Sequence, residues 1–425
     1  MSKIQTPAVV RPAAQESGLR GNSDFVNLWI AESISQIGSH ISLIALPLLA
    51  ILALDASPAQ MGLLSAAGTA PFLVIGLIVG VWVDRVRRRP LMIAADLLRA
   101  VLLLTVPVAW WGGFLRIELL YAVAVLTGSL TVVFDVAWMS FLPSIVRRGQ
   151  LVDANSRLQV SASVAQVSGP GIGGVLVGIA GAPLAILTDA ASFALSALFL
   201  LRAAPDGAQQ KNAVEVSSIR RDILEGLRVV FRDSVLRALV YSKVLVTFSA
   251  GMFFAVYMLF MAEDLGLGAT AIGIVFATGG IGSLLGAVIA ERASSRFGTG
   301  VTVIHGQFWF GAFGVAIPLA VLFPAIALVM VVLSEFAQWM AHIVSQVNEL
   351  SIRQAKVPDQ YLGRVNSVFQ FFGRGMTPIG ALMGGFLGEV IGIPMTLVVA
   401  TVGFFFAFLF VVFSPVRRFR LAHDQ

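Results

Sequence analysis

The side chains best suited to chemistry in this sequence are a few ionisable residues inside long apolar stretches. Glu32, Asp135 and Asp189 lie in the first half of the chain, and Lys243 and Glu335 lie in the second. An ionisable group at the centre of a bilayer costs at least about 2.5 to 3.5 kcal/mol to insert, so each is a candidate for function or for pairing with an opposite charge. The remaining members of the set are His342 and Arg374.

The composition shows that lipid surrounds most of the chain. Of 425 residues, 57% are hydrophobic and 12% are charged, whereas a soluble protein carries about 25% charged residues. A soluble enzyme is therefore excluded. Cysteine is absent, which removes thiolate nucleophiles and thiolate metal sites. The four histidines have no paired ligand spacing, and the chain lacks the phosphate-binding Gly-x-x-x-x-Gly-Lys-Ser/Thr loop. We expect no enzyme activity, metal or cofactor.

Twelve apolar runs are each long enough to cross a bilayer, which takes about 20 helical residues. The predicted fold class is an all-α membrane protein with 12 transmembrane helices in two six-helix bundles. Lys and Arg gather on one side of these runs, so we expect both termini in the cytoplasm and need no nucleic-acid partner for the +6 net charge. The predicted parts are a tail at 1–23, a bundle at 24–202, a linker at 203–235, a bundle at 236–414 and a tail at 415–425.

The plan includes span boundaries, a linker helix and an internal repeat. The fifth, tenth and eleventh predicted spans cover residues 159–180, 325–348 and 365–388. The linker contains an amphipathic stretch at 217–231, which either lies on the cytoplasmic leaflet or packs on other loops. The two halves also repeat each other at an offset of 211 residues. Asn155-Ser156 corresponds to Asn366-Ser367 in this register, and Gly174 corresponds to Gly385, so the halves are parallel repeats.

The cytoplasmic end of the second run carries a charged motif. Residues 80–89 read Gly-Val-Trp-Val-Asp-Arg-Val-Arg-Arg-Arg. This resembles the loop signature of the major facilitator superfamily, Gly-x-x-x-Asp-Arg-x-Gly-Arg-Lys, with Arg87 in place of the second glycine. An acid that ends an apolar helix beside several arginines can bridge neighbouring helix ends and latch one half to the other. The predicted gate residues are Gly80, Asp84, Arg85, Arg88 and Arg89.

The fifth run contains a second motif, Gly-Pro-Gly-Ile-Gly-Gly at 169–174. It resembles the core of the helix motif of drug antiporters in that superfamily, although Ala165 replaces a usual glycine. Proline removes a backbone hydrogen bond, and glycines allow close helix packing. The motif residues are Gly169, Pro170, Gly173 and Gly174.

Further stretches narrow the resemblance to one branch. Residues 142–155, 189–193 and 353–365 are similar to the branch that holds macrolide efflux proteins and the enterobactin exporter, and the likeness runs from Phe25 to Pro415. It implies proton-driven export of bulky organic compounds from the bacterial cytoplasm by a monomer in the plasma membrane. The alternatives are export of a siderophore or lipid-like metabolite, or a transport-dead receptor or scaffold.

In the fold that the resemblance implies, the first, fourth, seventh and tenth helices line one cavity. Proton-coupling candidates are then Glu32, Asp135, Glu335, Asp189 and His342, with Glu32 and Asp135 preferred. The ion-pair candidates are Lys243 and Arg374, and a structural Glu335–Arg374 pair is an equal alternative to coupling by Glu335. Asp96 and Arg99 lie nearer the end of the third run. Candidate substrate contacts are Trp29, Gln36, Phe134, Trp138, Phe254, Tyr257, Phe336 and Trp339.

Overall fold

Regular structure in the described part of this protein is helical throughout. The structure is a computed structural model that describes residues 19–83, 86–203 and 216–420, and these ranges contain no strand. The first six long helices are α1 (Ser23–Leu54), α2 (Pro58–Val83), α3 (Arg88–Trp111), α4 (Ile117–Ile145), α5 (Leu151–Ala180) and α6 (Ala182–Leu200). After α7 (Val216–Arg232) come α8 (Ser234–Leu259), α9 (Ala269–Phe297), α10 (Thr299–Leu319), α11 (Ala327–Lys356), α12 (Asp359–Ile391) and α13 (Ile393–Val412).

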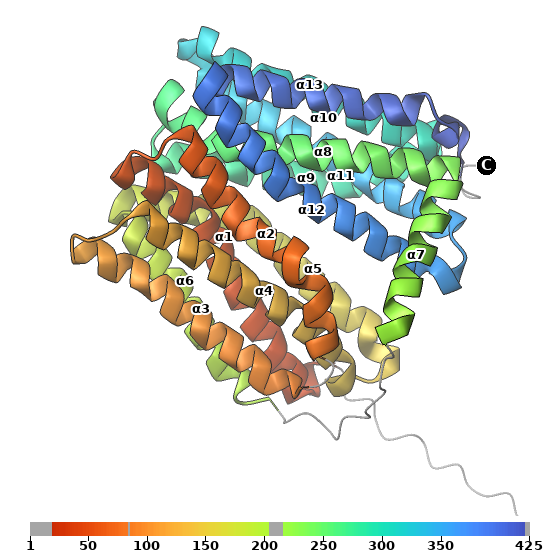
Figure 1. Ribbon diagram of the computed structural model, residues 1–425, viewed down its shortest axis with the longest axis horizontal. Coiled ribbons are helices and arrows are strands. Elements are labelled where there is room, and N and C mark those ends of the chain that lie inside the picture. The colour runs from red at the N-terminus through yellow and green to blue at the C-terminus, as the bar shows by residue number, and fades with distance from the viewer. Residues whose placement is uncertain (1–18, 84–85, 204–215, 421–425) are drawn as a thin grey trace, which may run out of the picture.

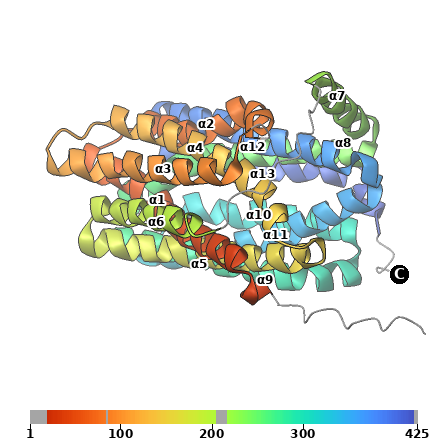
Figure 2. The same ribbon diagram turned by 90° about the horizontal axis from the view of Figure 1, so that it is seen from below.

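The helices form two bundles with the same internal packing. Helix α1 packs against α5 and α6, and α8 packs in the same way against α12 and α13. The pairs α2–α4 and α3–α4 correspond to α9–α11 and α10–α11. Figures 1 and 2 show the red-to-yellow helices α1–α6 in one half and the green-to-blue helices α8–α13 in the other. The predicted fold class is confirmed.

The membrane-spanning character of the helices follows from their length and composition. In the described residues, eleven helices are long and apolar enough to cross a bilayer. Helix α12, the eleventh predicted span, is not among them because it is more polar, and it packs against α2 and α8. Helices α5, α11 and α12 also extend beyond the predicted 159–180, 325–348 and 365–388. Hydropathy marks only the part of a helix inside hydrocarbon, whereas backbone hydrogen bonding continues into water.

The most extensive contacts between the bundles are two equivalent crossings, α2 with α12 and α5 with α9. Gly62 faces Gly385 at the first: an added Cβ on Gly62 would lie 2.7 Å from the Cα of Gly385. Gly174 faces Gly273 at the second, where the corresponding distance is 2.6 Å. Gly62 and Gly273 are 211 residues apart, as are Gly174 and Gly385. The predicted repeat therefore relates the two crossings to each other.

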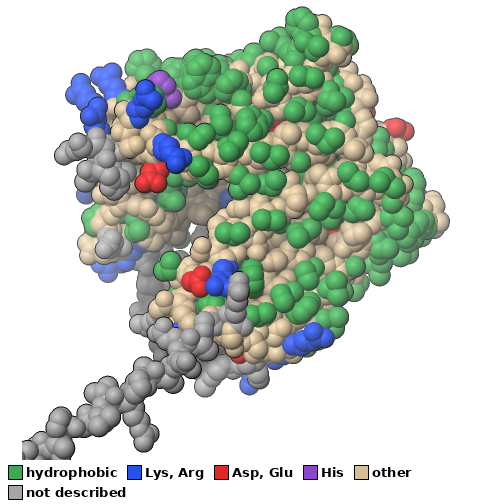
Figure 3. All heavy atoms as spheres, turned by 180° about the vertical axis from the view of Figure 1, so that it is seen from behind, with side chains coloured by type: hydrophobic (Ala, Val, Ile, Leu, Met, Phe, Trp, Pro, Cys, Tyr) green, Lys and Arg blue, Asp and Glu red, His purple; other side chains and the backbone are tan. Residues whose placement is uncertain are grey.

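These glycine crossings define a sealed end and an open end of the molecule. Both lie about a turn from the short connections that join α1 to α2, α5 to α6, and α8 to α9. The bundles diverge toward the opposite end, which carries α7 (Figure 1). Lys and Arg side chains gather at that open end, and the surface is hollowed there between the two halves (Figure 3). Hydrophobic side chains cover the lateral face in the same view.

Helix α7 packs against the second bundle at the open end. Arg364 of α12 donates to Glu225 of α7 at 2.7 Å. The backbone of α12 also approaches α7 closely, since an added Cβ on Gly226 would lie 2.8 Å from the carbonyl oxygen of Arg364. Arg221, Leu224 and further residues of α7 stay exposed. Of the two sequence-based interpretations, packing on neighbouring elements is observed, and contact with a leaflet stays a prediction.

Asp233 lies between α7 and α8 and caps the N-terminus of α8. Its carboxylate accepts from the backbone N–H of Val235 at 2.9 Å and of Leu236 at 3.0 Å, and from Lys356 Nζ at 2.9 Å. Partial burial raises the pKa of Asp233, but these hydrogen bonds outweigh it, so the pKa lies below its ordinary value. The charged form is therefore favoured in the folded chain. This contribution is complete above the unfolded pKa and is lost as pH falls through the lower folded pKa.

We expect Asp233→Ala to lower the stability of the purified protein by about 0.5 to 2 kcal/mol, the usual cost of losing an N-cap. Asp233→Asn keeps the cap but loses the charge, so it is expected to retain most of the stability. Thermal unfolding in detergent at neutral pH measures both. Equal unfolding temperatures for the alanine variant and the native chain would contradict the capping role.

Candidate functional site

A cavity of about 740 Å³ lies between the two bundles. Residues of α1 to α6 line one side, and residues of α8, α9, α11 and α12 line the other. The lining is mostly apolar and includes Phe72, Phe193, Phe254, Phe276 and Trp339. A pocket of this size, largely apolar with a few polar groups, suits an organic ligand.

The cavity holds opposite charges from opposite bundles. Asp135 of α4 and Arg374 of α12 both line it, and they are near enough for their charges to interact. They do not form a direct ion pair in this structure. The guanidinium of Arg374 instead lies 4.2 Å from the ring centroid of Phe72, a residue of α2. Charged groups of both signs are therefore available to a ligand at mid-cavity.

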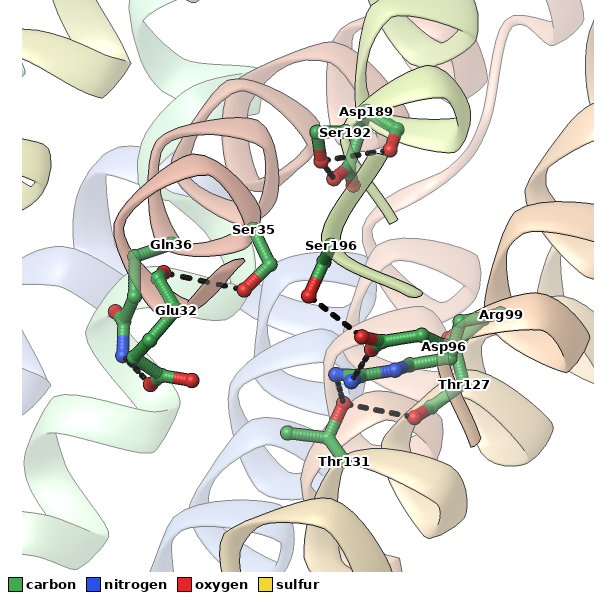
Figure 4. Close-up of polar contacts among 10 residues, drawn as sticks. All are labelled: Glu32, Ser35, Gln36, Asp96, Arg99, Thr127, Thr131, Asp189, Ser192 and Ser196. Atoms are coloured by element: carbon green, nitrogen blue, oxygen red, sulfur yellow. Dashed lines mark hydrogen bonds and ion pairs between the residues drawn. The ribbon is translucent and has the colours of Figure 1, made fainter. Parts of the chain in front are cut away.

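A buried polar cluster joins three helices of the first bundle and reaches the cavity lining (Figure 4). Arg99 and Asp96 of α3 form an ion pair in which their side chains are 4% and 0% exposed. Ser196 of α6 donates to Asp96 at 2.6 Å, and Arg99 donates to Thr131 of α4 at 3.3 Å. Three helices of the first bundle thus share one network, and Arg99 reaches the cavity lining.

Two aromatic rings hold the Arg99 guanidinium in place. It lies 4.1 Å from the ring centroid of Phe193 and 4.6 Å from that of Phe134. Cation–π contacts of this kind are worth about 2 kcal/mol or more when desolvated. Arg99 was not among the predicted site residues. The sequence signal was an Asp and an Arg three residues apart inside an apolar run, and it seemed to lie nearer the helix end.

The predicted coupling acids in the first bundle have different surroundings. Glu32 is 6% exposed and accepts from Gln36 Nε2 at 2.7 Å (Figure 4). It lies near Asp135 but is not part of the cavity lining. Asp189 does line the cavity and accepts from the Ser192 hydroxyl at 3.0 Å. Asp135 and Asp189 therefore meet the ligand space directly, whereas Glu32 is buried near Asp135 and outside the lining.

Glu335 in the second bundle is enclosed by hydrogen bonds. Tyr257 donates to one carboxylate oxygen at 3.0 Å, and Trp339 donates to the other at 2.8 Å. Glu335 is 1% exposed. The alternative of an ion pair between Glu335 and Arg374 is wrong, because Arg374 points instead into the cavity over Phe72.

The prediction that one chamber joins all the cavity-helix charges is also wrong. Asp135 lines the large cavity, whereas Lys243 and His342 line a separate small pocket inside the second bundle. Helix rotation decides this, because each side chain points where its helix face packs. Of the aromatic candidates, Phe254 and Trp339 line the large cavity. The other candidates do not line it: Trp29, Gln36, Phe134, Trp138, Tyr257 and Phe336.

The gate motif is described in part. Arg88 donates to the carbonyl oxygen of Ser140 at 2.9 Å, at the end of α4. Arg89 donates to those of Leu200 at 2.9 Å and Leu201 at 2.6 Å, at the end of α6. These arginines bridge the C-terminal ends of helices within the first bundle, where the helix dipole favours a positive charge. The predicted residues Asp84 and Arg85 lie outside the described residues, as does the side-chain environment of Gly80.

The glycine-proline motif of α5 packs on two helices at once. Gly169 and Gly173 face α1, at His40 and Ile41 respectively. Gly174 faces α9 of the other bundle, and the carbonyl oxygen of Pro170 also lies against Gly273. Each small residue lets a backbone approach closely. The motif therefore connects the cavity helix α1 to the crossing between the bundles.

The described residues contain no group of three His, Asp or Glu side chains that could hold a metal ion.

Two related six-helix bundles with a cavity between them are the arrangement of a membrane transporter built from parallel repeats. The family model of transmembrane secretion effectors matches residues 17–424. The chain belongs to this family, within the major facilitator superfamily, and is a multi-pass membrane protein.

Curated relatives include drug exporters. The chain is 28% identical to the multidrug efflux pump Tap of Mycolicibacterium fortuitum, over 90% of this chain and 93% of the relative. It is 26% identical to Tap of Mycobacterium tuberculosis, over 86% and 87%. It is also 27% identical to the MFS-type transporter y4rN of Sinorhizobium fredii, over 84% and 87%.

Solved structures share the fold. A bacterial homologue of the iron transporter ferroportin in an inward-facing state has a TM-score of 0.74 at 15% identity, over 91% of this chain and 97% of that chain. The nucleoside transporter NupG also has a TM-score of 0.74, at 14% identity and the same coverage. The structure of a bacterial ferroportin homologue in an outward-facing state has a TM-score of 0.57 at 17% identity, over 91% and 98%.

Proposed function

We propose that this protein exports bulky, largely apolar organic compounds by proton antiport across the bacterial plasma membrane. The observation that carries the proposal is the cavity of about 740 Å³ between the bundles, with an aromatic lining and charges from both sides. The similarity to pumps named for multidrug efflux supports the substrate class.

The proposed orientation places the α7 end in the cytoplasm. Lys and Arg are concentrated at this end, as expected for the cytoplasmic side of a membrane protein (Figure 3). The cavity then opens inward in this structure. The higher TM-score against the inward-facing than the outward-facing ferroportin homologue supports that assignment. In this proposal the bundles at 24–202 and 236–414 move as two units of one monomer, and the residue 80–89 loop serves as the cytoplasmic gate.

Asp135 and Glu32 are the proposed coupling acids. Asp135 lines the ligand space, and Glu32 lies near it, buried and hydrogen-bonded to Gln36. A carboxyl group that meets water on one side in one state and on the other side in the next can carry a proton against the substrate. Arg374 of the opposite bundle lies near enough for its charge to act on Asp135.

We expect Asp135→Asn and Glu32→Gln to abolish the response of transport to an imposed pH gradient, since an amide carries no exchangeable acid proton. Purified protein in liposomes, with ethidium or a macrolide as substrate, provides the assay. Asp153→Asn is the matched control, because Asp153 is 55% exposed and pairs only with Arg157 on the same helix. If both neutral variants respond to the gradient as the native protein does, these acids do not couple transport.

A further inference from the structure

The second bundle contains a small polar pocket that is separate from the substrate cavity. It has a volume of about 20 Å³ and shares no lining residue with the large cavity. Helix α8 contributes Lys243, α10 contributes Gln307, and α11 contributes His342 and Glu349. Glu349 was not among the predicted site residues, because it lies near the polar end of its helix.

The pocket brings opposite charges together without direct contact. Glu349 is 8% exposed, and Lys243 and Arg353 are near enough for their charges to act on it. Lys243 and Glu349 nevertheless form no direct ion pair. The guanidinium of Arg353 instead lies 4.5 Å from the ring centroid of Phe369. Lys243 and Glu349 therefore line the same small pocket without touching each other.

That space suits water. A cavity needs about 10 to 15 Å³ to hold a water molecule, together with two to four polar partners. Gln307 accepts from Ser242 through its side-chain oxygen at 3.0 Å, so its amide N–H groups remain available to the pocket. The hydroxyl of Ser345 donates to the carbonyl oxygen of Val303 at 3.2 Å and keeps its lone pairs. With Lys243, His342 and Glu349, these groups exceed the number of partners that water requires.

The pocket also has access to its surroundings in this open state. Lys243 and His342 are only partly buried, whereas Glu349 lies deeper. His342 packs between Phe310 and Trp339, at ring distances of 4.9 and 5.5 Å, so the pocket is closed toward Glu335 by aromatic rings. The partly exposed Lys243 and His342 therefore connect the buried Glu349 with the surroundings of the pocket, which shares no lining residue with the substrate cavity.

We propose that this pocket is a hydrated proton-binding site in the second bundle, with Glu349 as the group that holds the proton and Lys243 as its counter-charge. The site binds water and a proton, and it adds one proton to the exchange that Asp135 and Glu32 perform in the first bundle. The inference rests on proton antiport as the proposed function, but proton binding by Glu349 can be measured without any substrate.

The test compares the single variants Glu349→Gln and Lys243→Met with the double variant Lys243→Met, Glu349→Gln. The Glu349→Gln variant leaves Lys243 without its counter-charge and can fail to fold, whereas the double variant removes both charges together. Glu291→Gln on α9 is the control, because Glu291 is exposed. Infrared difference spectra of the purified full chain at two pH values report carboxyl protonation. We expect one carboxyl signal to be lost in the double variant and to move to another pH in Lys243→Met, with no such loss of that signal in the control.

The second measurement is the number of protons exchanged per ethidium in liposomes. We expect it to fall by about one in the double variant, since one carboxyl group holds one proton. An unchanged infrared signal in the double variant would overturn the site. Loss of the signal with unchanged stoichiometry would overturn its part in coupling. If the native protein moves ethidium without any proton exchange while the Glu349 signal still titrates, the proposed antiport fails and the proton-binding site stands.

Discussion

Leucine in place of Gly62 is expected to force the sealed end of the molecule apart. An added Cβ at this position already lies 2.6 Å from the carbonyl oxygen of Ala381 and 2.7 Å from the Cα of Gly385, closer than such atoms can approach. Neither neighbour is a flexible side-chain end, because both are backbone atoms of α12. The larger side chain is tolerated only when α2 and α12 separate.

The effect of this substitution is a shift between conformations. Overpacking costs about 1 to 3 kcal/mol. This corresponds to roughly 5- to 150-fold in the equilibrium between the conformation that is open at the α7 end and the one that is open at the glycine crossings. In the proposed mechanism transport requires both states, so turnover is expected to fall by a similar factor. Gly273→Leu is expected to act in the same way, because Gly273 occupies the repeat-related place against Gly174 and the carbonyl oxygen of Pro170.

Distances between paired spin labels measure the predicted opening. The chain has no cysteine, so a pair introduced at Ser57 and Val390 reports on the sealed end alone. The label distance is expected to increase in Gly62→Leu and in Gly273→Leu. Gly76→Leu serves as the control on α2, because an added Cβ there meets no atom within 4 Å. An unchanged distance in both crossing variants would show that the glycine contacts do not hold this end closed.

The second large effect is expected from Asp96→Ala, which leaves the buried Arg99 without its partner. Removal of one member of a buried ion pair costs about 3 to 5 kcal/mol, because the remaining charge stays in a low-dielectric site. Ser196 also loses its acceptor. We therefore expect a large fall in unfolding temperature and weaker ligand binding, since Arg99 lines the cavity.

A double variant separates charge from packing. Asp96→Leu with Arg99→Met removes both charges, and buried pairs replaced in this way often lose little stability. It is expected to recover most of the unfolding temperature but not the ligand binding. Asp153→Ala is the control, because it breaks an exposed pair with Arg157 that is worth about 0 to 1 kcal/mol. Thermal unfolding of all three in one detergent ranks them. Equal decreases in unfolding temperature for Asp96→Ala and Asp153→Ala would contradict the prediction that the buried ion pair contributes more to stability than the exposed one.

Much of the architecture could be predicted because membranes constrain helices strongly. A span needs about 20 apolar residues, and this requirement is visible in the chain without any knowledge of packing. The 211-residue repeat likewise predicted two related bundles, since segments with matching sequence patterns fold in the same way. Helix ends were less well placed, as α12 begins at Asp359 rather than at 365. Its polar first turns lie outside the hydrocarbon and give no hydropathy signal.

The sequence by itself determined that lipid surrounds this chain, that its helices form two related bundles, and which few residues bring charge into the apolar stretches. Only the tertiary structure decided which of those charges meet. Glu335 turned toward Tyr257 and Trp339, and Arg374 turned toward Phe72. The physical reason is that a membrane helix is apolar on most of its faces, so hydropathy sets its position but not its rotation. Rotation follows from contacts such as Gly62 with Gly385, which join residues far apart in the chain.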